Sequence, residues 1–128
     1  MTRSQRVFVY GTLRRRGSHH YLLSRGRYLG QYVTPAVYTM YDLGDYPAVI
    51  AGGRHRICGE VYRISLHTLA RLDEYEACPD EYYRYLITTP FGPSWMYFWR
   101  QPGIVTGYAA RAVSGGDWLQ YGNNGNQK

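Results

Sequence analysis

Two carboxylates on one side of a helix give the clearest chemical signal in this sequence. The stretch Ser65–Glu76, SLHTLARLDEYE, has a helical pattern with Ser65 as its N-cap. At about 100° per residue, Asp73 and Glu76 fall on the apolar side of this helix. The apolar residues of that side are Leu66, Leu69, Ala70 and Leu72, and the opposite half carries His67, Thr68, Arg71, Glu74 and Tyr75. A carboxyl group turned toward a core is desolvated, so its pKa rises toward the range that suits a general acid/base.

Both acids also have a structural interpretation. If the helix ends before Glu76, that side chain lies in solvent and belongs to an acidic turn with Asp80 and Glu81. Asp73 lies within the helix and can hydrogen-bond a nearby loop to hold it in place. The helical pattern alone leaves these alternatives open.

A polar turn follows the first apolar strand in the stretch RVFVYGTLRRRGSHHYLL, Arg6–Leu23. This turn can be a plain corner, a cradle for phosphate or nucleic acid, or a loop that holds a small polar substrate. No Lys follows Gly17, so the P-loop pattern is not met. The run Arg14–Arg16 is typical of a solvated basic turn and is also compatible with phosphate contacts. The adjacent His19 and His20 have diverging side chains and do not form a metal-binding pair.

Other catalytic signatures are missing from the sequence. Cys58 and Cys78 form no CxxC pair and no Cys/His cluster with zinc spacing, and we expect two free thiols. A GxSxG nucleophile motif is absent as well. The sequence therefore predicts neither a metal site nor an enzyme nucleophile.

Composition limits the class of protein. The 128 residues favour one domain with its own core, and 45% of them are hydrophobic. The net charge of +6 favours encounters with anions, including nucleic acid. Arginines and aromatics alternate in EYYRYLITT and MYFWR, which can form a stacking platform for RNA or simply a half-buried sheet face. No apolar stretch reaches the ~20 residues of a membrane span, and VFVY is too short for a signal peptide. We therefore expect a cytoplasmic protein.

Short strands and two short helices must position these residues. The predicted strands are Val7–Tyr10, two pieces of Tyr28–Asp42 around Pro35, the end of Asp42–Ile50, Arg56–Ile64, Glu81–Thr89 and Ser94–Trp99. The last two form a hairpin around PFGP. Ser18 is predicted to cap a helix through Leu23, the segment after Gly103 has no clear element, and the polar residues 120–128 are expected to be a disordered tail. This pattern predicts an α+β domain with a closed or curled sheet.

Five motifs in order, VFVYGTLR, YDLGDYPAV, ICGEVYRI, LDEYE and YYR, resemble the gamma-glutamylcyclotransferase-like family. The resemblance is greatest to the small bacterial and gamma-glutamylamine cyclotransferase branch of this family. The closing SGGDW of the sequence also resembles the ending of that branch. It covers residues 6–119, and it implies a small mixed β-barrel-like sheet with short helices in a domain of residues 1–119.

The resemblance also implies the residues of a substrate pocket. It assigns the catalytic acid/base to Glu76 and substrate contacts to Tyr10, Gly11, Thr12, Leu13, Tyr82 and Arg84. We expect Gly11 to let backbone N–H groups approach the substrate carboxylate closely. Tyr10 is either a pocket wall or part of the sheet packing. The basic run Arg14–Arg16, and Ala77 where the family commonly has Gly, depart from the family pattern and leave the choice of substrate open.

The reaction that the resemblance implies is an internal aminolysis. The α-amine of a γ-glutamyl compound attacks its own γ-carbonyl, closes 5-oxoproline and releases an amine. Glu76 would remove and then deliver the proton, with no cofactor or metal. The implied partner is a small γ-glutamyl substrate, and binding to a membrane or to nucleic acid is not expected. The resemblance specifies neither the leaving amine nor the oligomeric state. Two alternatives remain: a non-catalytic member that binds a small metabolite or protein, and a basic RNA-binding module.

Overall fold

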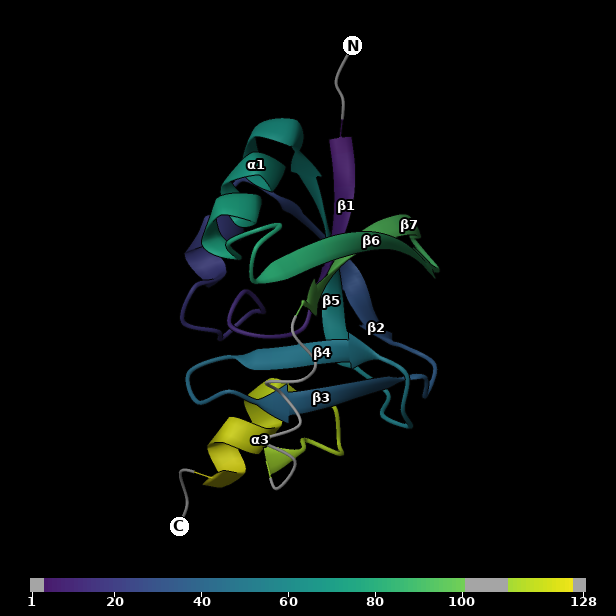
Figure 1. Cartoon of the computed structure of the whole chain (residues 1–128). Helices are drawn as coiled ribbons and strands as arrows, with labels where there is room; N and C mark the ends of the chain where they lie inside the picture. The colour runs from purple at the N-terminus through teal and green to yellow at the C-terminus, as the bar shows by residue number, and fades with distance from the viewer. Residues whose placement is uncertain (1–3, 101–110, 126–128) are drawn as a thin grey trace.

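The computed structural model describes residues 4–100 and 111–125, in which the strands form two sheets (Figure 1). The five-stranded sheet has the order β2-β5-β1-β7-β6, and the smaller sheet pairs β3 with β4. The strands are β1 Ser4–Val9, β2 Arg27–Val33, β3 Tyr38–Asp42, β4 Pro47–Ala51, β5 Cys58–Ser65, β6 Tyr82–Thr89 and β7 Gly92–Trp99. The helical elements are η1 His20–Leu23, α1 Leu66–Tyr75 and α3 Trp118–Gly125. The predicted α+β class and every predicted strand are therefore confirmed.

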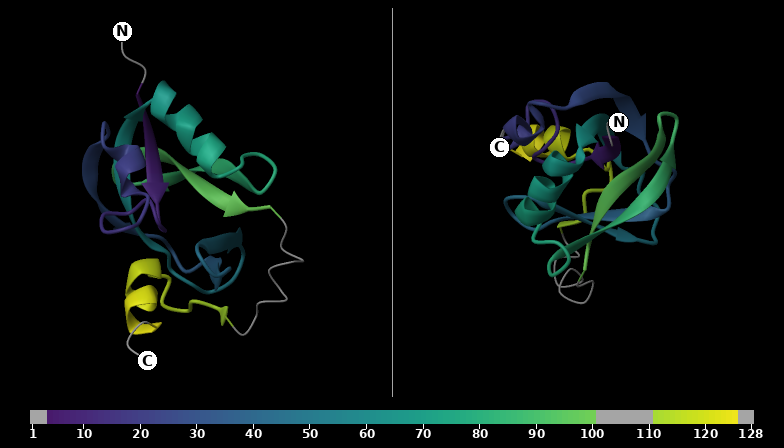
Figure 2. Two further views of the ribbon diagram at one scale, coloured as in Figure 1. Left: turned by 90° about the vertical axis from the view of Figure 1, so that its left-hand side faces the viewer. Right: turned by 90° about the horizontal axis from the view of Figure 1, so that it is seen from above.

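The second half of the central strand β1 is buried on both faces. Alternate side chains of a strand point to opposite faces, and in residues 7–9 both sets are apolar, whereas the polar residues 4–6 are more exposed. Val7 and Val9 pack in one core cluster with residues of α1, whereas Phe8 and Tyr10 pack in a second cluster with β3 and β4. α1 and α3 lie at opposite ends of the molecule, with β3 and β4 nearer to α3 (Figure 2).

The predicted barrel is only approximated, because the five-stranded sheet stays open. β2 and β6 are its edges, and no strand pairing joins them in the part of the chain that the structure describes. Instead, Phe91 at the β6–β7 turn packs on Gly30 of β2. A Cβ atom at Gly30 would lie 2.4 Å from the Phe91 ring, so the two edges meet through this ring without a backbone ladder.

Helix α1 begins and ends where its sequence predicts. The Ser65 hydroxyl accepts a hydrogen bond from the N–H of Thr68 at 3.1 Å, and Glu76 is the C-cap residue. The buried side is rotated from the predicted one. Thr68 is buried with Leu69 and Leu72, whereas the predicted apolar positions Leu66 and Ala70 are exposed.

Two predicted features at helix ends are wrong. Ser18 does not cap η1: His19 is the N-cap residue without a side-chain cap, and the Ser18 hydroxyl contacts the His19 ring instead. The expected disordered tail from residue 120 is helical through Gly125, because the Asp117 carboxylate accepts the N–H of Gln120 at 3.2 Å. The last tail residues, and the segment of unclear structure from Gly103 to residue 110, lie outside the described residues.

Candidate active site

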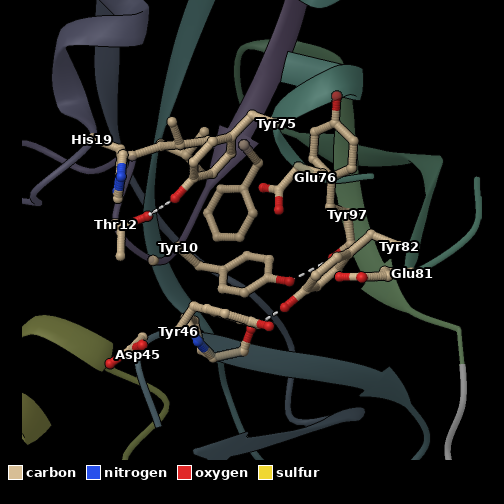
Figure 3. Close-up of a pocket in the computed structure, with 15 residues that line it drawn as sticks. Tyr10, Thr12, His19, Asp45, Tyr46, Tyr75, Glu76, Glu81, Tyr82 and Tyr97 are labelled. Carbon is tan, nitrogen blue, oxygen red and sulfur yellow. Dashed lines mark hydrogen bonds between the residues drawn. The ribbon is translucent and has the colours of Figure 1, made fainter. Parts of the chain in front are cut away.

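A cavity of about 360 Å³ opens where the loop after β1 meets the end of α1 and the start of β4 (Figure 3). Side chains of β6 and β7 complete its wall. Its lining residues are Phe8, Val9, Tyr10, Gly11, Thr12, Leu13, His19, Asp45, Tyr46, Pro47, Tyr75, Glu76, Glu81, Tyr82 and Tyr97. The cavity thus gathers Glu76, the predicted loop and Tyr82, which come from three separate parts of the chain.

Glu76 places a carboxyl group at the inner wall of this cavity (Figure 3). Burial, and secondarily the negative charge of Asp73, raise its pKa to about 8. Among the described residues, no side chain or backbone group hydrogen-bonds this carboxyl. It is therefore a group that can hold or release a proton near neutral pH and that has no structural partner to hold its charge.

Asp73 has the opposite environment. Its Oδ1 and Oδ2 accept hydrogen bonds from Arg84 Nε at 2.8 Å and Nη2 at 3.0 Å, and Oδ1 accepts one from the Tyr97 hydroxyl at 2.6 Å. Burial alone would raise the pKa of Asp73, but these hydrogen bonds outweigh it and hold the pKa below its usual value. Asp73 thus ties α1 to strands β6 and β7, and not to a nearby loop.

Arg84, to which the resemblance assigns a substrate contact, is not among the residues that line the cavity. Its guanidinium forms the bidentate pair with Asp73 and lies 4.2 Å from the centre of the Trp95 ring. Because one edge of this planar group pairs with Asp73 and one face lies against Trp95, Arg84 supports the helix that carries Glu76.

The loop after β1 is held by its own backbone. The N–H of Arg14 donates to the carbonyl of Gly11 at 3.1 Å, and the N–H of His19 donates to that of Thr12 at 2.9 Å. By contrast, the N–H groups of Gly11, Thr12 and Leu13 make no hydrogen bond to another described residue. Three successive N–H groups at the cavity wall are suited to an anionic oxygen.

Gly11 is required by packing as well as by its place in the loop. A Cβ atom there would lie 2.9 Å from Cγ and 3.0 Å from Cδ of Pro47. The Pro47 carbonyl accepts a hydrogen bond from the Tyr82 hydroxyl at 2.7 Å, so the proline is itself fixed across the cavity. The contact that limits residue 11 is therefore a side chain of β4.

Tyrosine hydroxyls fix the remaining walls. The Tyr10 hydroxyl donates to the carbonyl of Tyr97 at 2.6 Å, and burial raises its pKa well above the usual value. Tyr10 is therefore both a wall of the cavity and part of the core, so both interpretations of it hold. Tyr75 forms a hydrogen bond of 2.7 Å with the Thr12 hydroxyl and packs 4.9 Å from the His19 ring centre, which links α1 to the loop.

The run Arg14–Arg16 lies outside the cavity, and its members have two different environments. Arg14 is only 8% exposed and pairs with Glu60 at 3.3 Å and with Asp117 at 2.9 Å, so the solvated turn predicted for it is wrong. Arg15 and Arg16 are exposed, and the Arg15 guanidinium lies 5.0 Å from the centre of the Tyr28 ring. Arg14 joins the loop to β5 and to the start of α3.

The sequence did not predict several of the residues that line the cavity, although some of them lie in a recognisable sequence motif. Asp45, Tyr46 and Pro47 belong to YDLGDYPAV, one of the motifs that carry the family resemblance. Tyr75 was placed on the outer half of the helix, and its long side chain reaches the cavity edge from there. No sequence pattern distinguishes Tyr97 as a site residue, because it lies in a strand of mostly apolar residues.

The described residues contain neither a metal-binding cluster nor a membrane-spanning helix. No group of three or more His, Cys, Asp or Glu residues in the described part of the chain could hold a metal ion. Cys58 and Cys78 are both free thiols. None of the helices in residues 4–100 and 111–125 has the length and apolar character needed to cross a membrane.

Comparisons with known proteins agree with this geometry. The family model described as gamma-glutamyl cyclotransferase, AIG2-like, matches residues 7–120. The gamma-glutamylcyclotransferase family protein YtfP of Escherichia coli strain K12 is 40% identical over 114 residues, which are 89% of this chain and 96% of that protein. The bovine gamma-glutamylaminecyclotransferase is 40% identical over 90 residues, covering 61% of this chain and 52% of that protein. The solution structure of the E. coli protein ytfP has a TM-score of 0.71 at 40% identity and covers 90% of this chain and 96% of its own.

Proposed function

The chain belongs to the AIG2-like family of gamma-glutamyl cyclotransferases, and from this premise we propose that it releases 5-oxoproline and an amine from a γ-glutamyl amine or peptide. The observation that carries the proposal is Glu76, a cavity carboxyl with a pKa of about 8 and no hydrogen-bond partner among the described residues. The two relatives named above carry this activity in their names.

The nucleophile in this reaction belongs to the substrate. The α-amine nitrogen forms a bond to the γ-carbonyl carbon, and the bond from that carbon to the leaving nitrogen breaks. The first proton lost by the α-ammonium is taken up by the Glu76 carboxylate, which then delivers a proton to the leaving nitrogen. The attacking nitrogen loses a second proton to water as the lactam forms, and the released amine takes one up from water. Because the two reacting groups are joined in one molecule, the protein must mainly hold them in attack geometry.

The loop provides the anionic binding that this geometry needs. The N–H groups of Gly11, Thr12 and Leu13 can receive the α-carboxylate of the glutamyl group or the oxyanion that develops on the γ-carbonyl. Both roles fit a wall that faces Glu76 across the same cavity (Figure 3). In this proposal Arg84 supports the helix that carries Glu76 through its ion pair with Asp73.

The direct test is 5-oxoproline release from γ-glutamyl amines by the unaltered protein and by Glu76→Gln. We expect the variant to lose at least ~10²-fold in kcat, because an amide cannot accept the proton. Glu74→Gln is the matched control, since Glu74 is exposed on the outer side of α1 and does not line the cavity. Full activity of Glu76→Gln would remove Glu76 as the base. Binding of γ-glutamyl compounds without product would favour the non-catalytic alternative.

A further inference from the structure

A second cavity, of about 840 Å³, lies where the run Arg14–Arg16 meets strands β2 and β5 and the start of α3. It shares no lining residue with the cavity that holds Glu76. Its volume is in the range of small-molecule sites, which is about 300–1,000 Å³. The proposed reaction uses none of its residues, so the ligand of this second cavity is a separate question.

The two acids of the second cavity are already bound to the protein. Glu60 is only 4% exposed, and its Oε2 accepts a hydrogen bond from Arg14 Nε at 3.3 Å. Its Oε1 accepts hydrogen bonds from the N–H of Arg15 and from the Tyr62 hydroxyl, both at 2.9 Å. Asp117 Oδ1 accepts one from Arg14 Nη1 at 2.9 Å. Both acids therefore hold the loop in place, and the three lining arginines still outnumber them.

Arg15 and Arg16, by contrast, have no acceptor for their guanidinium groups. Both are exposed, and neither guanidinium forms an ion pair or a hydrogen bond within residues 4–100 and 111–125. The Arg15 guanidinium lies 5.0 Å from the centre of the Tyr28 ring, and a guanidinium that packs by its face keeps its N–H donors in its plane. Arg16 has a φ of 75°, a left-handed conformation that is uncommon for a residue with a side chain. Two adjacent cations thus line one cavity without an acid of their own.

The other lining groups suit the uncharged part of a ligand. The side-chain amides of Gln31 and Gln120 can donate and accept hydrogen bonds, and Tyr28 and Leu119 offer apolar contacts. Inorganic phosphate would contact the two arginines and leave these groups unused. A larger molecule with a phosphate group at one end would use both kinds of group.

We propose that the second cavity binds a small organic phosphate, with its phosphate group at Arg15 and Arg16 and its organic part beside Gln31 and Gln120. Guanidinium groups recognise phosphate oxygens through paired, charge-assisted hydrogen bonds. Cations gathered at one hollow suit a compact anion, whereas a nucleic-acid strand is bound by cations spread along its length. This site does not depend on the proposed reaction, and a binding measurement tests it without 5-oxoproline release.

The test is calorimetric titration of the full chain with three probes, namely ribose 5-phosphate, ribose and inorganic phosphate. We expect ribose 5-phosphate to bind with one-to-one stoichiometry and at least about tenfold more tightly than ribose, because only the former carries the charge. It should also bind more tightly than inorganic phosphate, which has no organic part. Equal affinities of ribose 5-phosphate and either other probe would overturn the proposal.

Variants assign the binding to the two arginines. Arg15→Gln together with Arg16→Gln should weaken the binding of ribose 5-phosphate at least about tenfold, since both phosphate contacts are lost. The matched control is Arg54→Gln together with Arg71→Gln, because these arginines are exposed and line neither cavity. Equal losses in the two double variants would reduce the effect to net charge and contradict the site.

A competing ligand decides between a compact and an extended anion. At about 0.15 M salt, a twelve-nucleotide RNA should bind no more tightly than ribose 5-phosphate, since only two cations are available to it here. Tighter binding of the RNA that is lost in the Arg15, Arg16 double variant would mean that these arginines contact a polyanion. That result would overturn the small-molecule site.

Discussion

Asp73 and Glu76 lie one turn apart at the end of α1, and their surroundings move their pKa values in opposite directions. Arg84 and Tyr97 hold the Asp73 carboxylate in its charged form, whereas burial and the charge of Asp73 favour the neutral form of Glu76. A pair of acids separated in this way supplies one fixed charge and one group that exchanges a proton near neutral pH.

The pH dependence of the reaction follows from the pKa of about 8 at Glu76. A general base acts only when ionised, so kcat/KM should fall about tenfold for each pH unit below 8 and level off above it. Measuring 5-oxoproline release from pH 5 to 9 tests this. A profile that is flat from pH 5 to 8 would contradict a base with this pKa.

Glu76→Gln should be more stable than the unaltered protein near pH 7. The folded-state pKa of about 8 lies above the usual 4.5, so between these values the folded state holds a proton that the unfolded state has lost. Stability therefore falls as pH rises through this window, and Gln avoids that loss. We expect a gain of ~1–3 kcal/mol at pH 7 that vanishes near pH 4. Denaturant unfolding at both pH values measures it, and a variant that is less stable at pH 7 would indicate a structural carboxylate.

Asp73→Asn should lower the pH midpoint of the activity. Removing the charge of Asp73 removes one cause of the raised pKa of Glu76, so the base ionises at lower pH. The variant should also lose ~1–3 kcal/mol of stability, because the Arg84 and Tyr97 donors lose their acceptor charge. The pH profile separates tuning from mere destabilisation, and Glu74→Gln should leave the midpoint unchanged. An unshifted midpoint in Asp73→Asn would exclude the coupling.

Gly11→Ala should weaken substrate binding and cost ~1–3 kcal/mol of stability, because its Cβ atom would press on the Pro47 ring. The double variant Gly11→Ala, Pro47→Ala removes the opposing Cγ and Cδ atoms and should recover part of both losses. Calorimetric binding of 5-oxoproline and thermal unfolding are the measurements. If the double variant is no better than the single one, the proline contact is not the limiting one.

Arg14→Ser should destabilise the fold far more than Arg15→Ser or Arg16→Ser. Arg14 is buried with Glu60, and breaking a buried pair from one side costs ~3–5 kcal/mol. The two exposed arginines should each change stability by about 0.5 kcal/mol, or slightly more where Arg15 leaves Tyr28. Chemical denaturation compares the three variants. Equal effects would contradict the structural role of Arg14.

The sequence by itself determined the local elements and the candidate acid. Short apolar and aromatic runs bounded by Gly and Pro predicted the strands, Ser65 marked the start of α1, and the helical pattern turned Glu76 inward. These features depend on periodicity and on neighbours a few residues away, which a sequence displays directly. The ordered motifs also indicated the family, which the comparison over residues 7–120 confirmed.

Only the tertiary structure decided which groups meet. Arg84 pairs with Asp73 and leaves the cavity, Gly11 packs against Pro47, and Arg14 is buried between Glu60 and Asp117. These partners lie between 11 and 103 residues apart along the chain. Contacts over such separations depend on how sheets and helices pack, and no local pattern encodes them. The raised pKa of Glu76 has the same origin, because burial in the folded chain is its largest cause.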